Sequence, residues 1–266
     1  MGDSLALVTG GGFGLGRDLA RHLRAAGLQV LICGRREAHL DAACAEIEGL
    51  HAVQADITVA AGRERLFEVA YAIGAPLDLL VNNAAISRAH DYTSTFTLEA
   101  DHARTEIEAN FAAPIELIRM YLRSRETRGW TDRPGTIANV STPGAMLPLE
   151  ANPLYVSTKA GLHMFTLTLR GHLHDTPVRV VEIFPPALDT GLAQDMFVPG
   201  QADNGPEVID AVAKRSVEGI LAGEEEILPH PQSEKLVAAA RWPGESLAPK
   251  LNRGIKRNDD WARAGS

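Results

Sequence analysis

The chain has 266 residues, 45% of them hydrophobic and 23% charged, which is typical of a soluble globular protein with a sizeable core. Its formal net charge of -8 argues against binding to nucleic acids or anionic lipids, because both need clustered Lys and Arg. No apolar stretch approaches the roughly 20 residues that span a bilayer, and no signal-peptide pattern is seen. We therefore expect a cytoplasmic protein without a nucleic-acid or membrane partner.

The apolar runs and helical periods alternate along the chain. Val-, Ile- and Leu-rich runs predict strands at Leu5–Val8, Gln29–Cys33, His51–Ala55, Leu77–Val81, Thr136–Val140, Val178–Phe184 and Glu226–Leu228. Helical spacing predicts helices at about 14–26, 37–48, 58–74, 96–128 with a break, 152–175, 206–222 and 233–241. This alternation is typical of βαβ units, so we expect an α/β fold with a doubly wound parallel sheet of about seven strands and helices on both faces.

Neither an internal repeat nor a low-complexity linker divides the sequence, which predicts one domain over 1–230 with 231–266 as a C-terminal extension of it. The stretch 187–205 is rich in Gly, Pro and Asp, and we expect it to form a lid over the substrate. Three alternatives remain for the extension: it covers the substrate cleft, docks on a neighbouring subunit, or is a frayed end. The two cysteines, Cys33 and Cys44, lack metal-ligand spacing, and no metal site is predicted.

A glycine-rich segment, Thr9 to Gly16, lies between the first strand and the first helix. Small residues at this place let backbone amides approach a pyrophosphate, and the dipole of the helix favours negative charge there. The spacing TGxxxGxG differs from GxGxxG, so an ordinary tight turn is the alternative. The predicted cofactor contacts here are Gly10, Gly12, Phe13, Gly14, Leu15 and Gly16.

Two arginines follow the second strand, where an NAD-binding enzyme usually has an acidic residue for the ribose hydroxyls. An acid would repel a 2′-phosphate, whereas Arg35 or Arg36 can bind one through two parallel hydrogen bonds. The sequence therefore favours NADP(H) as cofactor. The alternative is that both arginines are simply solvated at the start of a helix.

The next two strands also end in polar residues that we assign to the cofactor site. Asp56 could accept a hydrogen bond from the adenine amino group, with Ile57 beside it, or could instead cap the helix expected near Thr58. Asn83 and Ala84 follow the fourth strand. In an open α/β sheet this carboxyl edge of the strands is where ligands bind.

Tyr155 and Lys159 are four residues apart near the start of a predicted helix, which places both side chains on one face. A free phenol has a pKa of about 10, and a nearby cation lowers it. Tyr155 could then exchange a proton near neutral pH. A YxxxK pair taken alone is common by chance.

The ordered set of motifs resembles the short-chain dehydrogenase/reductase family over roughly residues 4–230. The set consists of TGxxxGxG, an aspartate after strand three, NNAA, Asn110, a Ser-Thr pair after strand five and YxxxK. The resemblance implies a Rossmann-like fold, with Tyr155 as general acid/base and Lys159 lowering its pKa while binding the nicotinamide ribose. It also implies that Asn110 holds a water in a proton relay.

The family's substrate-polarising hydroxyl lies thirteen residues before the tyrosine, which is Thr142 in this sequence, where serine is usual. Ser141 is adjacent, so either Thr142 serves or a local shift brings in Ser141, and we prefer Thr142. The usual Pro-Gly after strand six is replaced by Pro185-Pro186, which stiffens that turn. Pro185, Leu188 and Thr190 are further cofactor contacts implied by the resemblance, Thr190 binding the carboxamide.

These observations predict an NADP(H)-dependent oxidoreductase that transfers hydride between nicotinamide and a carbonyl or secondary alcohol. The alternatives are a redox-neutral relative, such as an epimerase or dehydratase, and a non-catalytic NADP(H)-binding module. The resemblance further implies a homodimer or homotetramer. A partly hydrophobic small-molecule substrate is indicated by the apolar residues Met146, Leu147, Leu149, Leu188, Met196 and Phe197.

Overall fold

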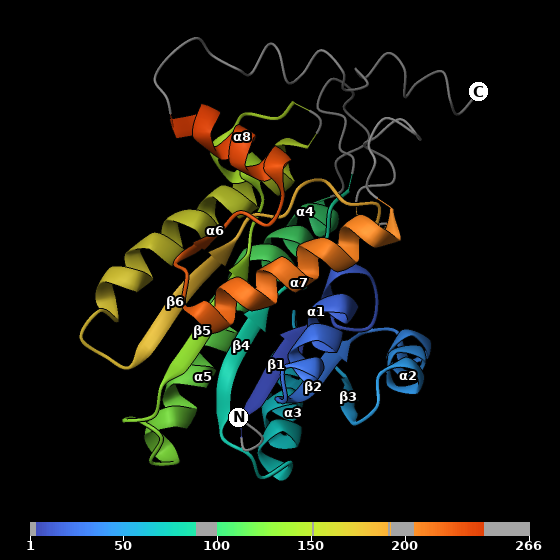
Figure 1. The fold of residues 1–266 in the computed structure, drawn as a ribbon, viewed down its shortest axis with the longest axis vertical. Helices are drawn as coiled ribbons and strands as arrows, with labels where there is room; N and C mark the ends of the chain where they lie inside the picture. Colours follow the sequence, from blue (N-terminus) through green and yellow to red (C-terminus); the bar gives the residue numbers. More distant parts are fainter. Residues whose placement is uncertain (1–3, 89–99, 151, 191, 193–204, 242–266) are drawn as a thin grey trace.

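The computed structural model describes residues 4–88, 100–150, 152–190, 192 and 205–241. Seven parallel strands form one sheet in the order β3-β2-β1-β4-β5-β6-β7 (Figure 1). Their bounds are Leu5–Thr9 (β1), Gln29–Gly34 (β2), Leu50–Gln54 (β3), Leu77–Asn82 (β4), Gly135–Val140 (β5), Val178–Ile183 (β6) and Glu226–Ile227 (β7). The predicted doubly wound parallel sheet is confirmed.

Helices connect the strands at nearly the predicted places. They are α1 (Gly14–Ala25), α2 (Glu37–Glu46), α3 (Ala60–Ala72), α4 (Ala100–Ile107), α5 (Ala113–Thr127), α6 (Pro153–His172), α7 (Pro206–Ala222) and α8 (Pro231–Arg241). The break expected within 96–128 is a π-helical turn, Glu108–Ala112, and a short 3₁₀ helix spans Pro143–Met146. None of the helices in the described ranges is long and apolar enough to cross a membrane.

The inner strands β2, β1, β4, β5 and β6 are buried on both faces because helices cover both faces of the sheet. One hydrophobic cluster packs α1, α2 and α7 against the sheet, with Leu19, Leu23 and Val212 among its buried residues. The second cluster packs α3, α5 and α6 on the other face, around Phe67 and Tyr121. Continuous apolar runs in the sequence correspond to this double burial.

The chain reverses its direction of sheet growth between β1 and β4, which are neighbours although two strands separate them in sequence. The Thr9 hydroxyl oxygen at the end of β1 accepts hydrogen bonds from the backbone N–H groups of Asn83 and Ala84, both at 3.0 Å. The Asn83 side-chain amide returns a hydrogen bond to the Thr9 carbonyl at 2.9 Å. Binding crevices of open α/β sheets form at this kind of switch point.

Thr9→Val should destabilise the fold, because it leaves the backbone N–H of Ala84 without its acceptor and the N–H of Asn83 with only the Val81 carbonyl at 3.2 Å. An unsatisfied buried donor costs roughly 1–3 kcal/mol, so we expect a loss of about 2 kcal/mol in the free energy of unfolding. Urea denaturation followed by tryptophan fluorescence measures it. Thr9→Ser keeps the hydroxyl and serves as the control, and a Thr9→Val protein as stable as wild type would contradict this account of the switch point.

Candidate functional site

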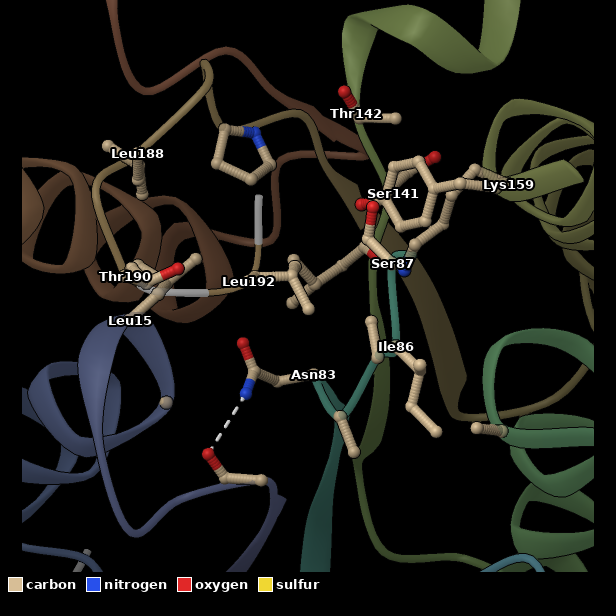
Figure 2. Close-up of a pocket in the computed structure, with 18 of the residues that line it drawn as sticks. Leu15, Asn83, Ile86, Ser87, Ser141, Thr142, Lys159, Leu188, Thr190 and Leu192 are labelled. Atoms are coloured by element: carbon tan, nitrogen blue, oxygen red, sulfur yellow. Dashed lines mark hydrogen bonds between the residues drawn. The ribbon is translucent and has the colours of Figure 1, made fainter. Parts of the chain in front are cut away.

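A pocket of about 530 Å³ runs along the carboxyl edge of the sheet, from the β1–α1 loop to α8. Figure 2 shows its walls: Leu15, Leu188 and Thr190 lie on one side, Ser141 and Lys159 on the other, and Asn83 and Ile86 border the space below. This volume is in the range of small-molecule and cofactor sites. Arg35 and Arg36 line one end of the pocket, and Thr142 and Tyr155 line the other.

The glycine-rich loop approaches its neighbours too closely for side chains at three positions, Gly10, Gly11 and Gly16. A Cβ atom at Gly16 would lie 2.2 Å from the carbonyl oxygen of Gly10. Gly10 and Gly14 also have φ values of 66° and 55°, which L-residues with side chains rarely adopt. The loop therefore presents bare backbone to the pocket, as close approach of a phosphate requires. Gly10, Phe13, Leu15 and Gly16 line the pocket, and Gly12 borders a small adjoining cavity.

The predicted adenosine end of the site is polar and open. Arg35 and Arg36 are exposed at the end of β2, and the Arg36 guanidinium lies 4.7 Å from the centroid of the Phe13 ring. Asp56 Oδ1 accepts hydrogen bonds from the Thr58 backbone N–H at 2.9 Å and from its hydroxyl at 2.7 Å. Asp56 thus orders the turn before α3, which begins at Ala60 rather than near Thr58. Ile57 lines the pocket beside it.

The side-chain amides of Asn83 and Asn110 hold the loops that border the pocket in place through hydrogen bonds to the backbone. Asn83 donates to the carbonyls of Thr9 and Gly10, so its amide holds the glycine-rich loop. Asn110, fully buried in the π-helical turn, donates to the Ile86 carbonyl at 2.7 Å and accepts from the Ile86 N–H at 2.7 Å. Its amide also reaches the Thr158 hydroxyl at 3.2 Å. The water relay expected through Asn110 stays a prediction.

Tyr155 and Lys159 lie on one face of α6 as their spacing predicted. The Lys159 Nζ atom lies 5.8 Å from the centroid of the Tyr155 ring and donates a hydrogen bond to the Val140 carbonyl at 2.7 Å. The first turn of α6 is fixed by Asn152, whose Oδ1 atom accepts from the Tyr155 backbone N–H at 3.1 Å. A buried ammonium one turn from the phenol is therefore built into the pocket wall.

Burial shifts both pKa values toward the neutral forms of the two groups. Burial, and second the negative charge of Glu106, raise the pKa of Tyr155 well above its usual value. Burial lowers the pKa of Lys159 to about 8, against an opposing contribution from Glu182. The expected lowering of the tyrosine pKa by Lys159 is not found, because desolvation of the phenol is the largest effect and the pKa of Tyr155 is raised.

The two candidate hydroxyls differ in burial and in their partners. Ser141 is 2% exposed, and its oxygen is fully buried without a hydrogen-bond partner among the described residues. Thr142 is half-buried, and its oxygen accepts from the Gly144 backbone N–H at 3.3 Å, capping the 3₁₀ helix. Both residues line the pocket.

The remaining wall of the pocket is largely apolar. Pro185, Leu188 and Thr190 line it as predicted, and a Cβ at Gly14 would lie 3.0 Å from the Thr190 Cβ, so Thr190 packs on the glycine-rich loop. The substrate end adds Leu147, Leu149, Leu192, Gln232 and Leu236. Met196, Phe197 and most of the predicted lid, 191 and 193–204, lie outside the described residues, whereas Met146 is described but does not line the pocket.

Gln232 and Leu236 are functional candidates that the sequence did not single out. They come from α8, which lies beyond the carboxyl ends of β5 and β6 and contacts the 3₁₀ helix (Figure 1). Of the three alternatives for the C-terminal extension, the position of residues 231–241 agrees with the one in which the extension covers the substrate cleft. The helix itself was predicted, but its contact with the pocket depends on packing between segments almost 90 residues apart.

Comparison with known proteins identifies the family that the sequence motifs resemble, and the match covers most of the chain. A family described as short chain dehydrogenase matches residues 4–198. An uncharacterized oxidoreductase, DltE, of Bacillus subtilis is 39% identical over 198 residues, 73% of this chain and 75% of that protein. Human L-xylulose reductase is 32% identical over 188 residues, covering 71% of this chain and 73% of its own.

Solved structures share the fold at lower identity. A short chain dehydrogenase from Burkholderia cenocepacia in complex with NADP has a TM-score of 0.76 at 22% identity, covering 93% of this chain and 96% of that one. A 3-ketoacyl-(acyl-carrier-protein) reductase from Brucella melitensis complexed with NADH has a TM-score of 0.68 at 24% identity, covering 86% and 92%. The extent of the family match, together with the 39% identity to one relative, establishes that the chain belongs to the short-chain dehydrogenase/reductase family of oxidoreductases.

Proposed function

We propose that the protein is an NADP(H)-dependent reductase of small, mainly apolar carbonyl compounds, with Tyr155 as the proton donor. The observation that carries this proposal is one continuous pocket with arginines at one end and Tyr155 and Lys159 at the other. The glycine-rich loop borders the pocket between these ends. A molecule that fits has a phosphate-bearing end, a middle approached by bare backbone and a reactive end beside a phenol.

A dinucleotide fits the residues present. The glycine-rich loop has no room for a Cβ at Gly16 and is suited to a pyrophosphate. Among the described residues that line the pocket with Arg35 and Arg36, the acidic one is Asp56. Asp56 is itself engaged with Thr58. Structural relatives have been solved with NADP and with NADH, so it is the arginine pair that favours the 2′-phosphate.

When bound, a reduced nicotinamide supplies the hydride that adds to the carbonyl carbon of the substrate. Tyr155 donates its phenolic proton to the carbonyl oxygen as negative charge develops there. Lys159, buried one turn away, stabilises the phenolate that remains, and its ammonium keeps the ribose end of the cofactor in place. The product is the alcohol, with one hydride and one proton added.

The electrostatics favour reduction over oxidation. Because burial and Glu106 raise the pKa of Tyr155, the phenol stays protonated at neutral pH, which is the form that donates to a carbonyl oxygen. Lys159, with a pKa of about 8, is mainly charged at pH 7. Both groups therefore hold the proton that reduction needs.

Thr142 is the better candidate for polarising the carbonyl oxygen. Ser141 Oγ has no accessible surface, so a substrate oxygen cannot reach it without a change in the protein. Thr142 is partly exposed in the pocket, and its hydroxyl oxygen accepts from Gly144, which leaves the hydroxyl proton to donate.

The substrate end favours an apolar molecule. Leu147, Leu149, Leu192 and Leu236 line it, and Gln232 adds a polar group from α8. The relatives include L-xylulose reductases, whose substrate is a sugar. The leucines of this pocket favour a less polar substrate than a sugar. We further propose that the protein is a homo-oligomer, as the resemblance to the family implies.

Arg35→Ala should weaken NADPH binding by about tenfold to a hundredfold, because a charged hydrogen-bonded pair contributes roughly 1.5–3 kcal/mol. NADH binding should stay unchanged, since NADH lacks the 2′-phosphate. Titration of the protein with each nucleotide, followed by nicotinamide fluorescence, measures both affinities. Arg65→Ala, an exposed arginine outside the pocket, is the matched control. If neither nucleotide binds to the wild-type protein, the proposed function is wrong.

Thr142→Val should lower kcat for carbonyl reduction by about a hundredfold or more, since a lost oxyanion donor costs 10²–10³. Thr142→Ser should retain most of the activity, and Ser141→Ala should lower kcat by less than about tenfold. Tyr155→Phe should lose about a thousandfold as the proton donor is removed. NADPH oxidation with an apolar diketone as probe measures each rate. A larger loss in Ser141→Ala than in Thr142→Val would reverse the assignment.

Leu236→Ala should raise KM for apolar carbonyl compounds by about tenfold, because removing several methylene groups from a pocket wall costs about 1–3 kcal/mol. The affinity for NADPH should not change, because Leu236 lies at the substrate end. Steady-state kinetics with a series of ketones of increasing chain length measure this. Lys235→Ala, exposed on the same helix, is the control, and equal KM values in both variants would exclude α8 from the substrate site.

A further inference from the structure

The carboxyl group of Glu182 is fully buried in β6, whose other charged residue, Arg179, is exposed. Its Oε2 atom lies 2.8 Å from Nδ1 of His163 on α6, whose side chain is 14% exposed. Its Oε1 atom is buried and has no hydrogen-bond partner among the residues that the structure describes. His163 also makes an edge contact with the Phe184 ring, at 5.7 Å between centroids.

This pair is an unfavourable way to stabilise a fold. Taking a carboxylate out of water is costly, and a single hydrogen bond does not replace its hydration. Glutamine has nearly the same shape and would accept a hydrogen bond from His163 without a buried charge. The presence of a carboxyl group at this buried position points to an electrostatic role.

The sheet register places Glu182 beside the catalytic lysine. Val140, whose carbonyl accepts the Lys159 hydrogen bond, is paired with Ile183, the residue after Glu182. Lys159 and His163 are four residues apart, so they lie one turn apart on the face of α6 toward the sheet. Glu182 contacts His163 directly and faces the same interval between helix and sheet as Lys159.

The other polar groups around Glu182 are neutral or paired elsewhere. On β5, Asn139 is opposite Glu182 and bonds to Asn82 and Thr166. On β7, Glu226 is paired with Arg241. On α6, Arg170 donates to the carbonyls of Val180 and Glu225. Tyr155 and Lys159 are the remaining titratable groups of α6 near this level.

The charges of Lys159 and Glu182 oppose the effect of burial. Burial alone disfavours the ammonium and lowers the pKa of Lys159 to about 8, and the negative charge of Glu182 works in the other direction. Nδ1 of His163, 2.8 Å from Glu182 Oε2, holds the carboxyl group of Glu182 against α6. The geometry thus fixes Glu182 where its charge acts on Lys159.

We propose that Glu182, held against α6 by its contact with His163, is a positioning residue that maintains Lys159 as an ammonium ion beneath the catalytic tyrosine. This inference rests on the proposed function, in which Lys159 supports Tyr155. Glu182 touches neither substrate nor cofactor and acts only through Lys159. Removing its charge should therefore change the pH range of activity rather than the affinity for NADPH.

The direct test is the titration of Lys159 by NMR in protein labelled with ¹³C at the lysine Cε. The sequence has only five lysines, and Lys159→Arg identifies the signal of Lys159 by its loss. In Glu182→Gln the titration midpoint of Lys159 should fall by roughly one pH unit, the size expected when a nearby opposite charge is removed. His163→Phe, which keeps an aromatic ring against Phe184, should lower it in the same direction.

Glu226→Gln is the matched control, because it removes a carboxylate from the position paired with Glu182 on the next strand. Its Lys159 midpoint should equal that of the wild type. A midpoint in Glu182→Gln and His163→Phe equal to that of Glu226→Gln would overturn the proposal. His163→Phe keeps the test decisive if Glu182→Gln does not fold.

The titration needs no substrate, so its result is independent of whether the protein reduces carbonyl compounds. Where reduction of the diketone probe is measurable, the alkaline limb of kcat should move to lower pH in Glu182→Gln, because Lys159 then loses its proton earlier. KM and the affinity for NADPH should stay within twofold of wild type. A uniform loss of kcat at every pH would indicate a merely structural role and would contradict the proposal.

Discussion

The geometry of the site depends on how the ends of β1 and β4 are joined. Parallel strands leave backbone N–H groups unpaired where the chain turns away from the sheet, and these groups need partners when they are buried. The Thr9 hydroxyl supplies one acceptor for two such groups, of Asn83 and Ala84, and Asn83 binds back to Thr9. The glycine-rich loop is thereby fixed relative to β4, and with it the middle of the pocket.

Buried polar side chains on β4, β5 and β6 also need hydrogen-bond partners. The register places Asn82, Asn139 and Glu182 side by side on three neighbouring strands, at the last residue of β4 and one residue before the ends of β5 and β6. Asn82 donates to Asn139, which donates to Thr166 of α6, and Glu182 is bound to His163 of the same helix. Polar groups in this layer fasten α6 to the sheet through directional bonds. Because α6 carries Tyr155 and Lys159, the layer also sets the position of the proposed catalytic pair.

Much of the fold and part of the site could be predicted from local sequence. The apolar runs identified all seven strands, since burial on both faces leaves a continuous signal, and α7 was predicted at its observed bounds. The α-helix break near Asn110 was expected, but its π-helical form depends on bonds to Ile86 and Thr158, 24 and 48 residues away. No local pattern contains that information.

Tertiary packing decided the parts of the site that local sequence left open. Ser141 and Thr142 are adjacent hydroxyls that differ mainly in burial, which only the folded environment sets. Glu182 did leave a signal, a lone acid within an apolar strand, yet its partner His163 is 19 residues earlier. Sequence alone placed α8 as a helix but could not place it against the pocket.

The catalysis proposed for this pocket requires a charged group where burial opposes charge. Desolvation raises the pKa of Tyr155 and lowers that of Lys159, so a dry pocket by itself would hold a neutral phenol beside an amine that has begun to lose its proton. A neutral phenol is what carbonyl reduction needs at the start, but the phenolate formed afterwards needs the ammonium. The buried carboxyl group of Glu182 favours the ammonium form of Lys159 and leaves the Tyr155 phenol neutral at the start. Its effect on Lys159 does not depend on water in the pocket. An apolar substrate wall and a buried carboxylate are therefore complementary: the wall excludes water from the reacting atoms, and the carboxylate preserves the charge that water would otherwise stabilise.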